Sequence, residues 1–121
     1  MSKNELNVHY VPKQVEVFCT ILDNHVELNK YLKEVILEHR KNKPESNTSN
    51  VKAWHSEYLT HLINPKFQPL IDEVMGAIRF ISDGFYGRKD IQYEVNNLWA
   101  MMYEDEEFTK RHNHWPDEFG V

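Results

Sequence analysis

The stretch Val15–Ile36, VEVFCTILDNHVELNKYLKEVI, contains the change of hydrophobic period that decides the fold class. Apolar residues first recur at every second position, which predicts a strand over 15–21 with one face on a core: Val15, Val17, Cys19 and Ile21. From Asp23 they recur three and four residues apart, which places them on one stripe of a helix: Leu28, Tyr31, Leu32, Val35 and Ile36. A strand followed by an amphipathic helix indicates a mixed architecture.

The helix after Asp23 is expected to cover 25–42, because Pro44 disfavours helical backbone at the residue before it. The polar stretch 44–50, PESNTSN, is typical of a loop, since small polar side chains bond to nearby backbone and compete with regular structure. After this loop, residues 51–56 alternate again and predict a short second strand.

A second amphipathic helix is predicted over 67–86. Its apolar face has helical spacing and comprises Phe67, Leu70, Ile71, Val74, Ile78, Ile81 and Phe85. Gly84 and Gly87 mark where it ends. Pro69 would lie inside a helix that began at Pro65, where a proline ring clashes and its missing N–H costs a hydrogen bond. We therefore expect a broken first turn, with the continuous helix beginning near Gln68 or Pro69.

Residues 91–115 are expected to form a long hairpin. The first arm has an apolar, aromatic-rich face at every second position: Ile91, Tyr93, Val95, Trp99, Met101 and Tyr103. The acidic run Glu104–Glu107 is the expected turn, and Phe108–Trp115 returns as the second arm. Together these elements predict a single domain, 1–121, of the α+β class: two amphipathic helices, near 25–42 and 67–86, packed on an antiparallel sheet.

Composition excludes several classes of protein. The chain has 121 residues, 40% of them hydrophobic, and a formal net charge of -5, which disfavours binding to nucleic-acid phosphates. The longest apolar run, Leu98–Tyr103, is far shorter than the roughly 20 residues that span a bilayer, so no membrane partner is expected. The single cysteine, Cys19, lies between apolar residues and predicts a buried thiol in a reducing compartment. We expect a cytoplasmic protein; the sequence leaves the oligomeric state open.

His112 and His114 are the candidate metal ligands, in the stretch Tyr103–Val121, YEDEEFTKRHNHWPDEFGV. Residues two apart in a strand point to the same face, so both imidazoles could bind one metal ion. Neutral imidazole suits Fe(II), Zn and Cu alike. From the residues alone, the alternative is a solvent-exposed hairpin arm that holds polar side chains.

The same stretch resembles a segment of the 2-oxoglutarate- and Fe(II)-dependent oxygenases common in phage and marine microbial genomes, which are related to prolyl 4-hydroxylases. The prolyl hydroxylase motif runs Tyr, an acidic residue, any residue, Gly, then after five more residues His, any residue, Asp. Tyr103 and Glu104 match its opening, and His112 falls at the His position with the same spacing. Glu106 stands in place of the Gly, and His114 in place of the Asp.

The resemblance extends over most of the chain, from about Val15 onwards, and includes SNVKAW at 49–54. It implies a jelly-roll-like double-stranded β-helix in which two His and one carboxylate hold Fe(II). It also implies a dioxygenase that couples oxidative decarboxylation of 2-oxoglutarate to hydroxylation of a substrate C–H bond. His112 would be the first iron ligand, and Tyr103 would help to bind 2-oxoglutarate. The resemblance does not define the substrate.

Two departures from the family bear on activity. His114 offers a neutral imidazole where the family has a carboxylate: either three nitrogens bind the iron, or Asp117 or Glu118 supplies the acid, or His114 is not a ligand. The family's distal His and the basic residue that pairs with the cosubstrate lie on later strands, beyond Val121. We therefore expect the chain to be the N-terminal part of a longer oxygenase domain and to be inactive by itself.

Other residues offer weaker alternatives. His55 and Glu57 have His-x-Glu spacing, with His61 nearby, but in the family this segment is not catalytic. Three further histidines, His9, His25 and His39, have no second ligand at a spacing that suggests a metal site, and they are expected to be solvated. The tryptophans Trp54, Trp99 and Trp115 fit packing better than a ligand-stacking set.

The second functional class left open is a small, non-catalytic α+β interaction protein. It predicts no metal site and an exposed apolar patch or sheet edge that binds a partner.

Overall fold

The computed structural model describes residues 6–11, 15–46 and 51–112. The chain divides into two compact units, the first comprising Met1–Val35 and Lys66–Val95, the second Ile36–Pro65 and Asn96–Val121. Helix α1 contributes residues to both units. The expectation of a single domain stays a prediction.

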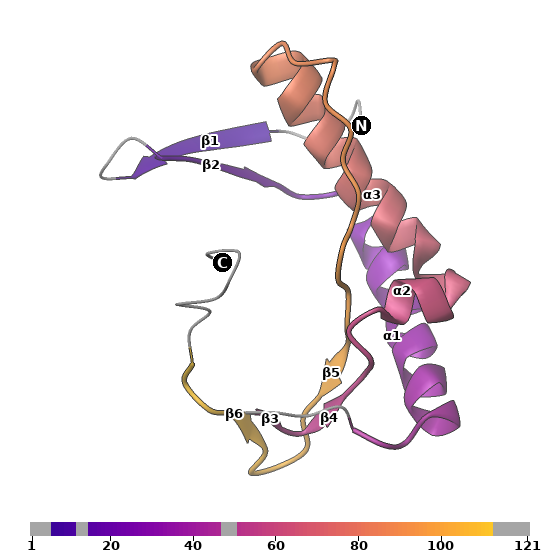
Figure 1. The fold of residues 1–121 in the computed structure, drawn as a ribbon. Helices are drawn as coiled ribbons and strands as arrows, with labels where there is room; N and C mark the ends of the chain where they lie inside the picture. The colour runs from indigo at the N-terminus through magenta and orange to yellow at the C-terminus, as the bar shows by residue number, and fades with distance from the viewer. Residues whose placement is uncertain (1–5, 12–14, 47–50, 113–121) are drawn as a thin grey trace. The chain divides into compact units, whose positions relative to one another are not determined.

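The first unit begins with an antiparallel pair of strands, β1 (Leu6–Val11) and β2 (Val15–Thr20), shown in Figure 1. Strand β2 confirms the strand expected over 15–21, whereas nothing in the sequence pattern had indicated β1. The register pairs Leu6 with Thr20 and Val11 with Val15. The two strands therefore form a ribbon with a short connection.

The face of β2 that packs is the opposite of the one predicted. Val17 and Cys19 are exposed, and Ile21, just after the strand, is 73% exposed. Phe18, on the other face, packs edge-to-face on Phe85, with ring centroids 5.0 Å apart. The expectation of a buried thiol at Cys19 is thus wrong. Period 2 identifies the two faces of a strand but not which one is covered, and here an aromatic ring, with its larger apolar area, takes the covered side.

Helix α1 (His25–Asn42) confirms the helix predicted from the apolar stripe (Figure 1). Leu28 and Val35 are buried, and Leu32 lies between them on the same face. The helix ends before Pro44, as expected from the backbone restriction that a proline imposes on the preceding residue. Basic residues in its last turn complement the partial negative charge at the carboxyl end of the helix.

The second predicted helix is confirmed, with its broken start. A short helix, α2 (Thr60–Ile63), and a single 3-10 turn, η1 (Pro65–Phe67), precede α3 (Gln68–Arg79). Pro69 occupies the first turn of α3, where its missing N–H costs no intrahelical bond. The helix continues to Phe85 as a π-helix, η2 (Phe80–Phe85), and Gly87, with φ of +66°, follows its end.

The long hairpin predicted over 91–115 is wrong. Residues 91–97 form no strand, and the described residues of the two predicted arms, 91–103 and 108–112, do not pair with each other; 113–115 lie outside the described residues. Instead β3 (Val51–Lys52) pairs antiparallel with β6 (Phe108–Thr109), and β4 (Trp54–His55) pairs antiparallel with β5 (Met101–Met102), as Figure 1 shows. The short strand expected over 51–56 is therefore confirmed as β3 and β4, which pair with β6 and β5.

The aromatic pattern over 91–95 has another physical cause. The Tyr93 hydroxyl donates to Ser82 Oγ at 3.1 Å, and the Arg79 guanidinium lies 5.3 Å from the centre of the Tyr93 ring. The Tyr93 side chain thus contacts the α3–η2 helix rather than a strand partner.

A small polar and aromatic core holds the second unit together. Its buried residues include Ala53, Trp54, Ser56, Thr60 and Ala100. Ser56 Oγ accepts a hydrogen bond from the Ala100 N–H at 2.7 Å and lies 2.7 Å from Thr60 Oγ1. These bonds tie the segment after β4 to the segment before β5.

The described residues form an α+β fold whose three sheets are each two-stranded and antiparallel. The double-stranded β-helix implied by the family resemblance stays a proposal. None of the helices within the described ranges combines the length and apolar composition needed to cross a bilayer.

Candidate functional site

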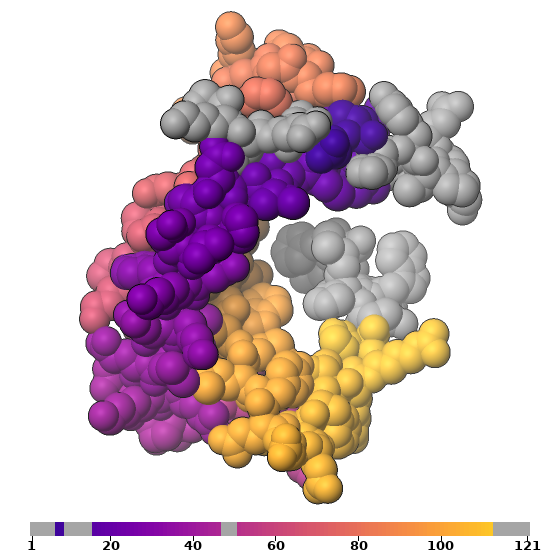
Figure 2. Space-filling model, turned by 180° about the vertical axis from the view of Figure 1, so that it is seen from behind, coloured from indigo at the N-terminus to yellow at the C-terminus, as the bar shows by residue number. Residues whose placement is uncertain are grey.

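The segment 101–112, here called the arm, carries the described residues of the predicted iron site. It comprises β5, the acidic turn, β6 and the residues up to His112, and it lies at the molecular surface, orange to yellow in Figure 2. The Tyr103 hydroxyl forms a hydrogen bond with Thr109 Oγ1, across the turn. Tyr103 therefore has an exposed but oriented phenol group.

The acidic run forms the expected turn. The Glu107 N–H donates to the Glu104 carbonyl at 3.1 Å, and the Glu104 N–H donates to Glu107 Oε1 at 2.6 Å. Glu106 has a φ of +68°, in the left-handed region that glycine adopts at no steric cost. For a residue with a Cβ, this backbone conformation costs about 1–2 kcal/mol of conformational free energy. The one position at which the arm has glycine-like backbone is thus the position where the family motif has Gly.

His112 is exposed near the end of the described chain. Its Nδ1 donates to the Lys110 carbonyl at 2.9 Å. Its expected partner His114, and the alternative ligands Asp117 and Glu118, lie outside the described residues. Whether His112 and His114 face one ion stays a prediction. Among the described residues, no three His, Cys, Asp or Glu side chains form a group that could hold a metal ion.

The rival pair, His55 and Glu57, does not converge on one point. His55 is buried; its Nδ1 bonds to the Ser56 carbonyl at 2.5 Å, and its ring stacks on Trp99 with centroids 5.4 Å apart. Glu57 is turned instead toward α1. Its carboxylate and the His55 ring therefore take part in separate interactions.

A buried network around His39 is the feature that the sequence analysis missed. His39 is only 4% exposed; its Nε2 donates to Glu57 Oε1 at 2.9 Å, and Asn64 Nδ2 donates to its Nδ1 at 3.1 Å. Lys43 Nζ lies 3.4 Å from Glu57 Oε2. The expectation that His39 is solvated is wrong.

A sequence signal for this burial was present. His39 lies four residues after Val35 on α1, so it continues the apolar stripe that begins at Leu28. Its role is structural: both ring nitrogens have protein partners, and the Trp54 ring packs edge-to-face at 6.1 Å.

Glu57 carries the electrostatic signature of this network. The hydrogen bond from His39 holds the pKa of Glu57 below its ordinary value of 4.5; Lys43 adds to this effect and burial opposes it. The network therefore favours the ionised carboxylate.

The tryptophans lie in different environments. Trp54 is buried, and its Nε1 donates to the Lys43 carbonyl at 3.1 Å, which confirms a packing role. Trp99 is partly exposed above His55, and Trp115 lies outside the described residues.

Comparison of the chain with protein-family models, curated proteins and solved structures gives no match.

Proposed function

We propose that this chain is part of a 2-oxoglutarate- and Fe(II)-dependent dioxygenase that hydroxylates its substrate. The observation that carries the proposal is the backbone of Glu106, whose φ of +68° occurs where the prolyl hydroxylase motif has Gly. An L-residue rarely adopts this conformation, so its occurrence at that one position supports a turn of the family's shape. His112 follows this turn at the motif's spacing.

The chemistry of His112 fits an iron ligand. Metal-binding histidines commonly donate their other ring N–H to a backbone carbonyl, which orients the ring and fixes the tautomer. The bond from His112 Nδ1 to the Lys110 carbonyl is of this kind. In this proposal His112 binds Fe(II) through Nε2 and His114 supplies a second nitrogen. The third ligand is Asp117, Glu118 or a further imidazole.

Tyr103 would bind the cosubstrate. Its phenol is exposed on the arm and held by Thr109, so it can offer a hydrogen bond to a carboxylate of 2-oxoglutarate. When bound, the iron would supply a centre at which dioxygen, the oxidant, reacts with 2-oxoglutarate as co-reductant, and the residues of the arm would hold the metal and the cosubstrate.

A cobalt titration tests the proposal, because Co(II) replaces Fe(II) and is stable in air. His112→Ala should weaken Co(II) binding by more than about tenfold, since even outer ligand partners contribute about 10- to 100-fold. His25→Ala is the matched control: His25 is also exposed, and its Nδ1 lies 2.8 Å from a backbone carbonyl, that of Leu22. Equal cobalt affinity in the wild type and both variants would remove His112 from the site.

One feature favours the alternative of a non-catalytic interaction protein. Leu62 on α2 is 71% exposed, and Leu59 and Ile63 beside it are also exposed. Exposed apolar patches often mark protein contacts. An interaction protein needs no metal, so the same titration separates the two proposed functions. The interaction function predicts no saturable Co(II) binding by the wild type, His112→Ala or His25→Ala.

A further inference from the structure

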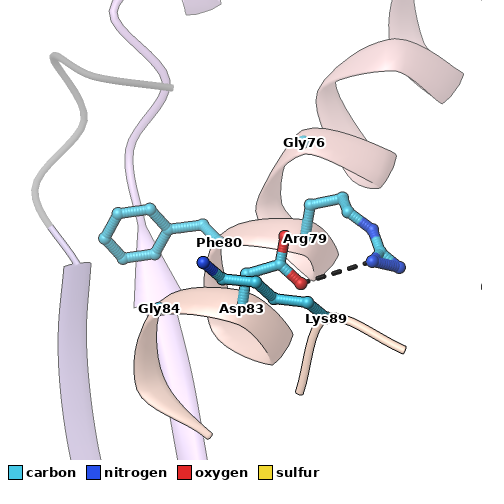
Figure 3. A pocket seen from close by; sticks show the side chains of 6 residues that line it. All are labelled: Gly76, Arg79, Phe80, Asp83, Gly84 and Lys89. Carbon is cyan, nitrogen blue, oxygen red and sulfur yellow. Dashed lines mark hydrogen bonds and ion pairs between the residues drawn. The ribbon is translucent and has the colours of Figure 1, made fainter. Parts of the chain in front are cut away.

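We propose that a pocket on the α3–η2 helix binds small organic carboxylates that have an apolar body. The pocket, shown in Figure 3, has a volume of about 600 Å³. It is lined by Gly76, Arg79, Phe80, Asp83, Gly84 and Lys89. All six belong to the first unit, whereas Tyr103 and His112 belong to the second, so the proposed ligand is not the cosubstrate of the iron site.

The helix backbone makes the space. Gly76, Phe80 and Gly84 follow one another at intervals of four residues, and the two glycines place no side chain into the pocket. A Cβ built on Gly84 would meet no atom within 4 Å, so this side of the pocket is open. The pocket also spans the passage from α-helix to π-helix at Phe80, and π-helical turns are rare and often occur at functional sites.

The charges around the pocket do not cancel. Arg79 Nη1 lies 3.3 Å from Asp83 Oδ1, and its Nη2 bonds to the Ile91 carbonyl. Arg88 and Asp90 pair with each other, with Nε 3.0 Å from Oδ1. Lys89 forms no ion pair with any residue in the described ranges and lines the pocket. A chain with a net charge of -5 therefore keeps one uncompensated cation at this place.

The side chains are arranged to take a carboxylate and an apolar group together. In Figure 3 the Lys89 ammonium points to the side on which the Phe80 ring lies, and the Arg79 guanidinium points to the opposite side. Phe80 is 43% exposed, so its ring offers apolar surface next to the ammonium. A carboxylate would pair with Lys89, while the body of the ligand covers Phe80 and fills the space above Gly84.

Glycine-selective ¹⁵N labelling provides a direct readout, because the chain has only four glycines: Gly76, Gly84, Gly87 and Gly120. The probes are phenylacetate, acetate and benzylammonium, titrated at constant ionic strength. Phenylacetate should shift the amide signals of Gly76 and Gly84 saturably and more than those of the other two. Acetate should bind more weakly because it lacks the apolar body, and benzylammonium should give no saturable shift.

Two variants and one control locate the site. Lys89→Gln should weaken phenylacetate binding by about fivefold, as for an exposed ion pair. Gly84→Leu should abolish it by filling the space, without a clash at Cβ. Lys33→Gln removes the same charge from an exposed position on α1 and should leave binding unchanged. Equal effects of Lys89→Gln and Lys33→Gln, equal shifts of all four glycines, or saturable binding of benzylammonium would each overturn the proposal.

Discussion

At the scale of single residues, backbone conformation and hydrogen bonding define what each position requires. Glu106 occupies left-handed backbone despite its side chain, and His39 is buried despite its polarity. The left-handed backbone at Glu106 costs free energy that a glycine at this position would not cost. The burial of His39 is tolerated because the imidazole finds hydrogen-bond partners on both ring nitrogens, Glu57 and Asn64.

Replacing Glu106 by glycine should stabilise the protein. Relief of the left-handed strain, about 1–2 kcal/mol, exceeds the cost of a more flexible unfolded chain, about 0.4–1 kcal/mol. We expect a net gain of about 0.5–1 kcal/mol in the free energy of unfolding, measured by urea denaturation. Asp105→Gly is the control: Asp105 lies in the same turn without a positive φ, so this variant should lose stability. A loss in both variants would contradict the strain at Glu106.

The network at Glu57 should make stability depend on pH. Because the folded-state pKa of Glu57 is lowered from 4.5, its contribution is complete above the unfolded value and is lost as pH falls through the folded value. Glu57→Gln should therefore lose stability relative to the wild type at pH 6, with the difference shrinking steadily below about pH 4.5. Urea denaturation at several pH values measures it.

An exposed carboxylate provides the comparison for this pH series. Glu94 is exposed and forms no ion pair with the residues that the structure describes, so Glu94→Gln should change the free energy of unfolding only slightly. A difference for Glu57→Gln that stays constant from pH 6 to pH 3 would show that the carboxylate charge is not involved.

At the scale of elements, short strands depend on partners far away in the chain. Strands β3 and β4 have two residues each, and they pair with β6 and β5, roughly fifty residues later. Such short ladders provide few backbone bonds by themselves. The buried hydroxyl of Ser56 adds a side-chain link between the same two segments, because it accepts from the Ala100 N–H.

Removal of this hydroxyl should therefore be costly. Ser56→Ala leaves the buried Ala100 N–H without its acceptor, which should lower the free energy of unfolding by about 1–3 kcal/mol. Tyr31→Phe is the control: it also removes a hydroxyl that bonds to a backbone group, the Lys66 carbonyl at 2.8 Å, but both residues are exposed and water can replace the bond. Thermal unfolding of both variants tests whether Ser56→Ala loses more stability than the control. Equal losses of stability in the two variants would show that burial of the Ala100 N–H does not raise the cost of removing its acceptor.

At the scale of the whole molecule, charge is distributed unevenly along the chain. The acidic turn 104–107 and the uncompensated Lys89 lie in different compact units. Each candidate site is thus formed by residues of a single unit. The arm belongs to the second unit, and the α3–η2 pocket belongs to the first. The tests proposed for the two sites are accordingly independent, since one measures cobalt affinity and the other the binding of a carboxylate without metal.

The sequence by itself determined the features that depend on neighbouring residues. These are the extents of α1 and α3, the broken turn at Pro65–Phe67, the acidic turn and the strand β2. Helical period, proline stereochemistry and turn composition act within a few residues, so they can be recognised without knowledge of the rest of the chain. The candidate ligand His112 was also found in this way, from its spacing to Tyr103.

The tertiary structure alone decided the features that depend on distant partners. Alternation over 91–103 was compatible with a hairpin, but the short strands at 51–55 proved to be the partners, and Tyr93 packs on Arg79 instead. The covered face of β2 was decided by the contact of Phe18 with Phe85, and the burial of His39 by Glu57 and Asn64. A local pattern defines which side chains share a face; only packing decides what that face meets.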